Sequence, residues 1–177
     1  MVIARRFMIR FVSIAAVLLA FYYFPYPAGG VVKRVLDAYL HAYAVVSAAV
    51  IGLFEPGVRV SGVEIVGRYA LRIVKTCDAM DVKTLFVAAV LAWPAPWRRR
   101  LAAAASGVAL LFVVNVIRIS SLYFVGLHLP SAFETIHLEL WPIVMIAIAL
   151  GTFVVAMAWM NGTSLASLLP ARDDGPS

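Results

Sequence analysis

Residues 101–125 read LAAAASGVALLFVVNVIRISSLYFV, and this run decides the class of the protein. It exceeds the roughly 20 apolar residues that cross a bilayer as a helix, and Asn115 and Arg118 are its only strongly polar members. The whole chain has 177 residues, of which 64% are hydrophobic and 14% charged. A soluble domain is about half apolar, and so short a chain cannot hide this much apolar surface from water. The sequence therefore predicts an all-α integral membrane protein.

The remaining apolar runs extend this prediction to one membrane-embedded domain over residues 1–160. We expect a helix bundle of about four transmembrane helices, at about 8–24, 78–97, 101–125 and 141–160. Residues 8–24 follow a basic start but no clear small-residue cleavage site follows them, so we interpret them as a retained span.

The segments between the spans differ in character. Residues 31–54 carry their charges in the first half, which predicts an interfacial or re-entrant helix. Residues 55–76 alternate polar and apolar side chains, which predicts a small extracytoplasmic hairpin with strands over 59–66 and 68–75. Residues 126–140 are expected as a loop, and 161–177 as a disordered polar tail.

The net charge of +6 is interpreted as a topology signal, not as a nucleic-acid surface. The basic clusters at Arg5, Arg6 and Arg10 and at 98–100 both favour the cytoplasm. This places seven Lys and Arg residues inside and seven outside, Lys83 among the latter, so a five-span alternative stays open. On either topology Cys77, the Arg118 end of its span and His137 share one face of the membrane.

Arg118 is the least expected residue, because a cation in the hydrocarbon region costs roughly 2.5–3.5 kcal/mol and normally faces a cavity or a partner. Asn115 lies three residues earlier, on the same helix face. The alternative is an arginine that extends to the nearby membrane surface. Cys77 is the single cysteine, so no intramolecular disulfide can form. It is either a small buried apolar residue or, near a helix N-terminus, a nucleophilic thiolate.

His137 precedes the last span and is either a solvated interfacial histidine or a proton-transfer group. His128 is similarly placed. The histidines and glutamates of this loop lack the spacing of a zinc motif, and we expect no metal and no cofactor. Cysteine, histidine and a fixed cation at one membrane face are together the parts of thiol-based acyl transfer.

Cys77, the run 115–118 (Asn-Val-Ile-Arg) and His137 before a terminal span resemble the exosortase/archaeosortase family. Residues 120–128 and 133–141 are similar to its short exosortase H type. The resemblance implies a multi-pass protein of the bacterial inner (cytoplasmic) membrane, with its active site facing the periplasm. It also implies a cysteine protease or transpeptidase that processes the C-terminal sorting signals of exported proteins.

On this resemblance Cys77 is the nucleophile, His137 the general acid and base, and Arg118 the group that stabilises the oxyanion or orients the substrate. We assign substrate binding to Asn115, His128 and Trp141. The expected partners are exported proteins with a C-terminal hydrophobic sorting signal and membrane lipid, with no nucleic acid.

One position departs from the family pattern, which often has glycine two residues after the cysteine. Here Asp78 and Ala79 follow Cys77, and a left-handed turn would cost alanine more than glycine. A non-enzymatic interpretation also stays open, in which a transporter subunit or assembly scaffold uses Arg118 as a counter-ion. A haem or quinone subunit is a third interpretation.

Overall fold

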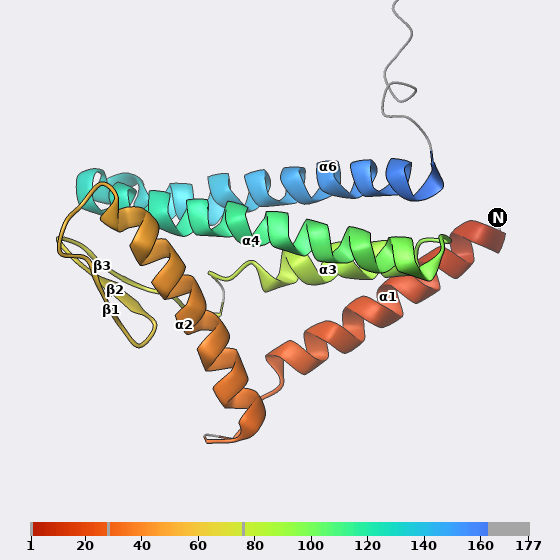
Figure 1. The fold of residues 1–177 in the computed structure, drawn as a ribbon, viewed down its shortest axis with the longest axis horizontal. Helices are drawn as coiled ribbons and strands as arrows, with labels where there is room; N and C mark the ends of the chain where they lie inside the picture. Colours follow the sequence, from red (N-terminus) through yellow and green to blue (C-terminus); the bar gives the residue numbers. More distant parts are fainter. Residues whose placement is uncertain (1, 28, 76, 163–177) are drawn as a thin grey trace, which may run out of the picture.

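The computed structural model describes residues 2–27, 29–75 and 77–162, and helices dominate it (Figure 1). The long helices are α1 (Val2–Tyr23), α2 (Val31–Gly52), α3 (Met80–Ala92), α4 (Trp97–His128) and α6 (Trp141–Asn161). Four stretches are long and apolar enough to cross a membrane: Ala4–Tyr23, Val31–Gly52, Trp97–His128 and Pro130–Asn161. The predicted all-α membrane protein is thereby confirmed.

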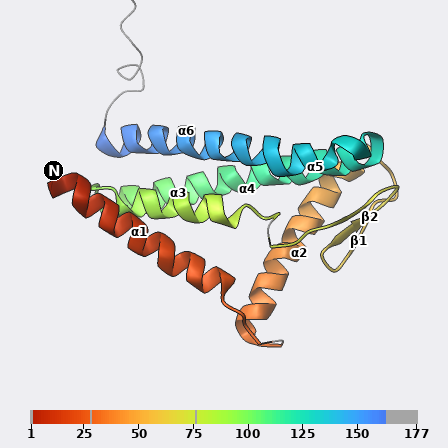
Figure 2. The same cartoon turned by 180° about the vertical axis from the view of Figure 1, so that it is seen from behind.

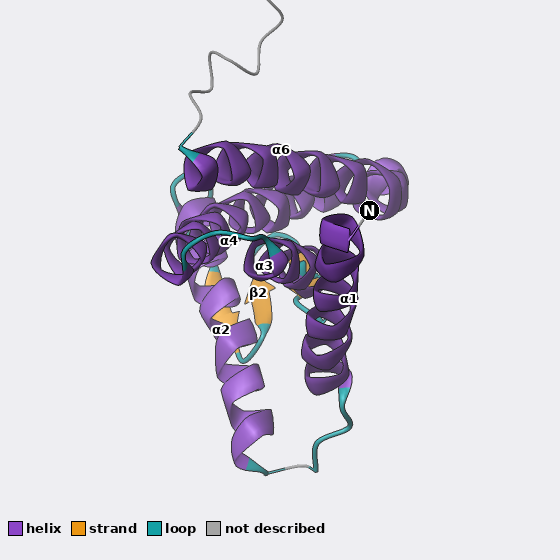
Figure 3. Cartoon of the chain, turned by 90° about the vertical axis from the view of Figure 1, so that its right-hand side faces the viewer, coloured by secondary structure: helices purple, strands orange, loops and turns teal. Residues whose placement is uncertain are grey.

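Helices α3, α4 and α6 lie lengthwise against one another, α1 packs along α3, and α2 is inclined away from the bundle (Figures 1 and 2). Viewed end-on, α3 lies between α4 and α1, and α6 covers the other side of α4 (Figure 3). The segment expected as an interfacial or re-entrant helix forms α2, one continuous helix of 22 residues that packs against α4 and the sheet.

Helices α3 and α4 form a helical hairpin but differ greatly in length. Pro94 and Pro96 interrupt the chain between them, because proline cannot continue a helix. At 1.5 Å per residue, the 32 residues of α4 extend about 48 Å and the 13 of α3 only about 20 Å. The start of α3 therefore lies beside the middle of α4, well inside the bundle.

The segment expected as an extracytoplasmic hairpin forms three short antiparallel strands, not the two longer strands expected. They are β1 (Arg59–Ser61), β2 (Glu64–Val66) and β3 (Ala70–Arg72), in the order β1-β2-β3. The run 59–66 folds back on itself at Gly62, whose φ of +62° suits glycine and few other residues. The alternation of polar and apolar residues indicates strands. It does not reveal the turn at Gly62, because polar and apolar residues alternate on both sides of it.

The predicted loop over 126–140 is mostly helical as well. Helix α4 continues to His128, a 3₁₀ turn follows (Pro130–Ala132), and α5 (Phe133–Thr135) leads through a π-helical turn (Ile136–Leu140) into α6. Most of the predicted disordered tail, residues 163–177, lies outside the described residues.

Two clusters of buried side chains hold the fold together. The first joins α2, the sheet and α4, and the second joins α3, α4 and α6. Both clusters include α4, so this helix is the common support for the sheet on one side and for the start of α3 on the other.

Candidate functional site

Cys77, Arg118 and His137 line one cavity of about 310 Å³. Cys77 comes from the turn before α3, Arg118 from α4, and His137 from the π-helical turn before α6. Residues 69–74, which include β3, form another wall. Segments separated by up to 60 positions in the sequence thus bring a thiol, a guanidinium and an imidazole to the same space.

The turn that carries Cys77 is fixed by its backbone. The Cys77 N–H donates to the Val74 carbonyl at 2.8 Å, and the Asn115 amide donates to the Cys77 carbonyl at 3.0 Å. Asp78 Oδ1 accepts from the Met80 N–H at 2.9 Å, an arrangement typical of aspartate at turns. These bonds hold the thiol three residues before Met80, the first residue of α3.

Ala79 adopts the left-handed conformation, with φ +53° and ψ +33°. Among the described residues it is the only one other than glycine with a positive φ. This is the position at which the resemblance noted in the sequence often has glycine, the residue that adopts a left-handed conformation at least cost.

A buried polar network outside the cavity supports the turn. The Lys83 ammonium, 4% exposed, donates to the hydroxyls of Tyr39 at 2.7 Å and Tyr43 at 2.6 Å and to the Asp78 carbonyl. The Asp78 carboxylate is fully buried and accepts from the Tyr22 hydroxyl. Lys83 was expected among the outer charges, and that expectation is wrong, because the side chain extends into the bundle.

Arg118 lies one helical turn beyond Asn115 and is 6% exposed. Its Nε is buried without a hydrogen-bond partner, and no ion pair is found for it within the described ranges. An arginine that merely reached the membrane surface would be exposed, whereas this one faces the cavity. Its guanidinium is therefore available to an anionic or strongly polar ligand.

His137 packs against the ring of Phe133, with ring centroids 5.6 Å apart and planes 22° from parallel. Its Nδ1 is also buried with no hydrogen-bond partner in the part of the chain that the structure describes. The histidine lies in a π-helical turn, and such turns frequently occur at functional sites. The ring has a fixed position and an unused nitrogen, which are requirements for proton transfer.

The other residues assigned to substrate binding lie away from the cavity. Asn115 is fully buried behind Cys77 and bonds to its backbone. His128 is exposed at the end of α4 and borders a different hollow, beside Glu55. Trp141 is half-buried and packs against the α3–α4–α6 cluster. In the described ranges no three His, Cys, Asp or Glu side chains gather closely enough to hold a metal ion.

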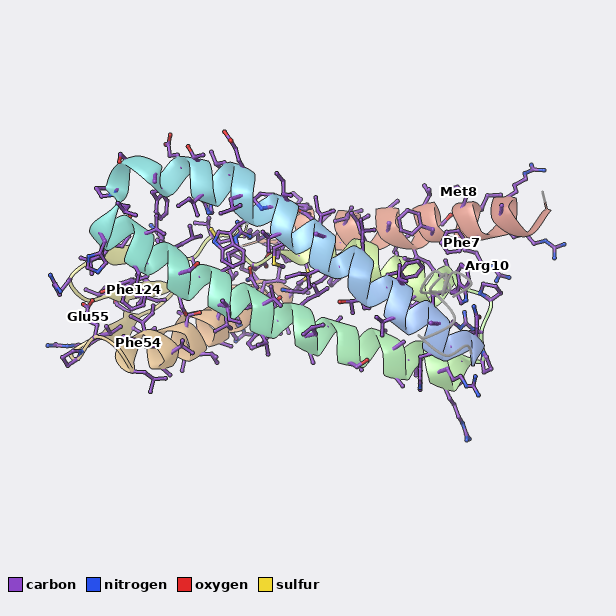
Figure 4. All side chains as sticks on the ribbon, turned by 90° about the horizontal axis from the view of Figure 1, so that it is seen from above. Phe7, Met8, Arg10, Phe54, Glu55 and Phe124 are labelled. Carbon is purple, nitrogen blue, oxygen red and sulfur yellow. The ribbon has the colours of Figure 1, made fainter. Side chains whose placement is uncertain are left out.

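Glu55 anchors the sheet that walls the cavity. Its carboxylate accepts from the Arg68 N–H at 2.8 Å and from the Tyr123 hydroxyl at 2.9 Å. The Arg68 N–H, which favours the charged form, lowers the pKa of Glu55. Glu55 and Phe124 lie at the opposite end of the molecule from Phe7 and Arg10 (Figure 4). The sheet is thus fastened to the end of α4 remote from the basic N-terminus.

The sequence analysis missed the network of Lys83 with Tyr39 and Tyr43. One signal was present: Lys83 begins the run KTLFVAAVLA, in which every later residue but Thr84 is apolar. A second was the spacing of Tyr39 and Tyr43, which lie one helical turn apart on the same face of α2.

Comparison with known proteins gives one match. A family model described as "Transmembrane exosortase (Exosortase_EpsH)" matches residues 3–155, which is most of the chain. No curated protein and no solved structure matches. The resemblance found in the residues around Cys77, Arg118 and His137 is confirmed at the level of the family.

Proposed function

The chain belongs to the transmembrane exosortase family, and on this premise we propose that it is a membrane-embedded cysteine protease or transpeptidase. The observation that carries the proposal is the cavity shared by Cys77, Arg118 and His137. The substrates are exported proteins that end in a hydrophobic sorting signal. The basic residues 98–100 lie in the cytoplasm, so the cavity opens toward the periplasmic face of the inner membrane.

In the proposed reaction the Cys77 thiolate attacks the scissile carbonyl carbon and forms a C–S bond. The guanidinium of Arg118 donates to the oxyanion that develops on the carbonyl oxygen. His137 has taken the thiol proton and gives it to the departing amine as the C–N bond breaks. An acceptor amine or hydroxyl, or water, then attacks the thioester and regenerates the thiol.

Three residues outside the cavity position the nucleophile. Asn115 and Lys83 bond to the carbonyls of Cys77 and Asp78, and Asp78 itself bonds to the first N–H of α3. None of them lines the cavity, so we infer that they act through the turn and not on the substrate.

The test uses an exported reporter that carries a C-terminal hydrophobic segment. Its processing in cells that express the chain is measured as a loss of reporter mass. Cys77→Ala is expected to abolish processing with membrane insertion unchanged. Arg118→Lys lowers the rate about 10²- to 10³-fold and His137→Gln about 10²- to 10⁴-fold. His41→Gln is the matched control, because His41 lies on α2, outside the cavity. Full processing by Cys77→Ala would remove Cys77 as the nucleophile.

A further inference from the structure

One edge of the sheet lies open beside the candidate nucleophile. β3 pairs with β2 on one side only, since the strand order is β1-β2-β3. Toward β2, the Ile73 N–H donates to Val63 and the Tyr69 carbonyl accepts from Gly67. Backbone groups alternate in direction along an antiparallel strand, so those of Ala70 and Arg72 point away from β2.

No hydrogen bond is found for these outward groups in the described ranges, and both residues are exposed. A strand edge with free N–H and C=O groups is a template for another strand, and proteins normally cover or block such edges.

The cavity runs along this open edge. Its wall contains six consecutive residues, 69–74. Successive side chains of a strand point to opposite faces, so a cavity over one face would border only every second residue. Tyr69, Leu71 and Ile73 pack toward the α2–α4 cluster, and the residues between them face away from it. A space bordered by both sets lies at the edge of β3.

We propose that this cavity receives an extended polypeptide segment, which pairs with β3 as a fourth strand and thereby presents its scissile carbonyl to Cys77. The inference rests on the proposed function and specifies how the substrate is recognised. The free groups of Ala70 and Arg72 bind the peptide backbone, and Arg118 and His137 line the same cavity. Recognition through the backbone fixes the register of the peptide with few side-chain requirements.

An extended segment also suits the chemistry better than a helical one. Inside a helix, each carbonyl already accepts a hydrogen bond from the amide four residues later and is screened by the helix itself. A strand leaves alternate carbonyls free to face the thiol. Near the membrane, unpaired peptide groups are costly, and pairing with β3 satisfies those on one side of the incoming segment.

The test uses the full chain in detergent micelles and the probe acetyl-Val-Ala-Val-Ala chloromethyl ketone. The Cys77 thiolate displaces chloride and forms a thioether, which intact-mass spectrometry follows without ambiguity, because the chain has a single cysteine. Probes with an N-methyl group at each peptide nitrogen in turn remove one donor at a time. N-methylation at alternate positions is expected to slow labelling about fivefold to tenfold per lost hydrogen bond, whereas N-methylation at the positions between them leaves the labelling rate unchanged.

A pair of proline variants tests the same edge from the protein side. Ala70→Pro removes an outward N–H at the first residue of β3, where proline is tolerated. Val60→Pro is the matched control, because the Val60 N–H points outward from β1, the opposite edge. Ala70→Pro is expected to slow the peptide probe about fivefold, and Val60→Pro leaves its rate unchanged. Iodoacetamide should label all three proteins equally, which shows that the thiol itself is intact.

Two other results are decisive. If the peptide probe labels Cys77 with no alternation among N-methyl positions and equal rates in both proline variants, the strand-pairing inference is wrong and the proposed function stands. If neither iodoacetamide nor the probe modifies Cys77, the thiol is not a nucleophile, and the proposed function falls together with the inference.

Discussion

Ala79 offers the sharpest test of the turn that carries Cys77. It is 8% exposed and belongs to the α3–α4–α6 cluster, so it is an apolar residue in an apolar core. At an ordinary core position valine is tolerated better than glycine. The φ of +53° reverses this order, because a left-handed backbone brings Cβ too close to the following carbonyl. We expect Ala79→Gly to be well tolerated and Ala79→Val to be harmful.

The expected magnitudes follow from opposing effects. Glycine relieves about 1–2 kcal/mol of left-handed strain. It loses about 0.8 kcal/mol with the buried methyl group and about 0.5–1 kcal/mol through the greater entropy of the unfolded chain. Ala79→Gly should therefore lie within about 1 kcal/mol of the parent protein. Valine increases the strain and adds two carbons to a filled space, so Ala79→Val should cost about 2–4 kcal/mol.

The assay is unfolding in mixed micelles with increasing SDS, followed by circular dichroism for the whole chain and by iodoacetamide pulses for the turn. The single cysteine makes the pulse specific to the turn, since Cys77 lies two residues from the substitution. A valine variant as stable as the parent would refute the left-handed backbone at residue 79. A glycine variant destabilised by more than about 2 kcal/mol would refute the estimated balance between left-handed strain, the buried methyl group and the entropy of the unfolded chain.

Two further predictions concern the supports of the site. A Cβ at residue 107 would overlap the Phe86 ring, so Gly107→Ala should lower stability by about 1–3 kcal/mol. Gly151→Ala, in open space on α6, should be neutral or slightly stabilising in the same SDS unfolding assay; equal losses would exclude close packing at 107. Glu55 has a pKa below its ordinary 4.5, so its stabilising effect is present above that pH and is lost as the pH falls through the lower folded value. Glu55→Gln should abolish this acid-side decline in SDS unfolding midpoints between about pH 5 and 3, and parallel curves for the two proteins would contradict it.

Hydropathy predicted three of the four expected spans, because lipid imposes simple requirements on long apolar runs. The fourth, 78–97, holds only the 13-residue α3, which is short for a span, whereas 31–54, expected as an interfacial or re-entrant helix, contains α2, which is long and apolar enough to cross. Helices α1, α4 and α6 fall close to the expected spans, since a helix is the way a single apolar segment satisfies its backbone in a bilayer. The sheet was harder to predict, because a two-residue turn at Gly62 leaves the alternation of side chains intact. Helix α2 was ambiguous for another reason: its charges at Lys33 and Asp37 pair with each other.

The candidate site was predictable in its members but not in its support. Arg118 was recognisable because a lone cation in an apolar run requires an explanation. Lys83 was not, because it lies near the start of its run, where lysine normally indicates a membrane edge. Only the folded chain shows that α3 begins inside the bundle and brings Lys83 under Tyr39 and Tyr43.

The shortness of α3 connects these observations. Because α3 is less than half the length of α4, the chain before it leaves helical structure beside Asn115, about 27 Å along α4 from Trp97. Irregular backbone at such a depth is tolerated only where protein satisfies its polar groups or where it lines a cavity. Here Asn115 and Lys83 satisfy the two carbonyls of the turn. Both have a structural reason to be polar and neither lines the cavity, although Asn115 Oδ1 is itself unpaired. Arg118 and His137 line the cavity and retain unpaired nitrogens, and this placement separates the groups available for chemistry from the support of the turn.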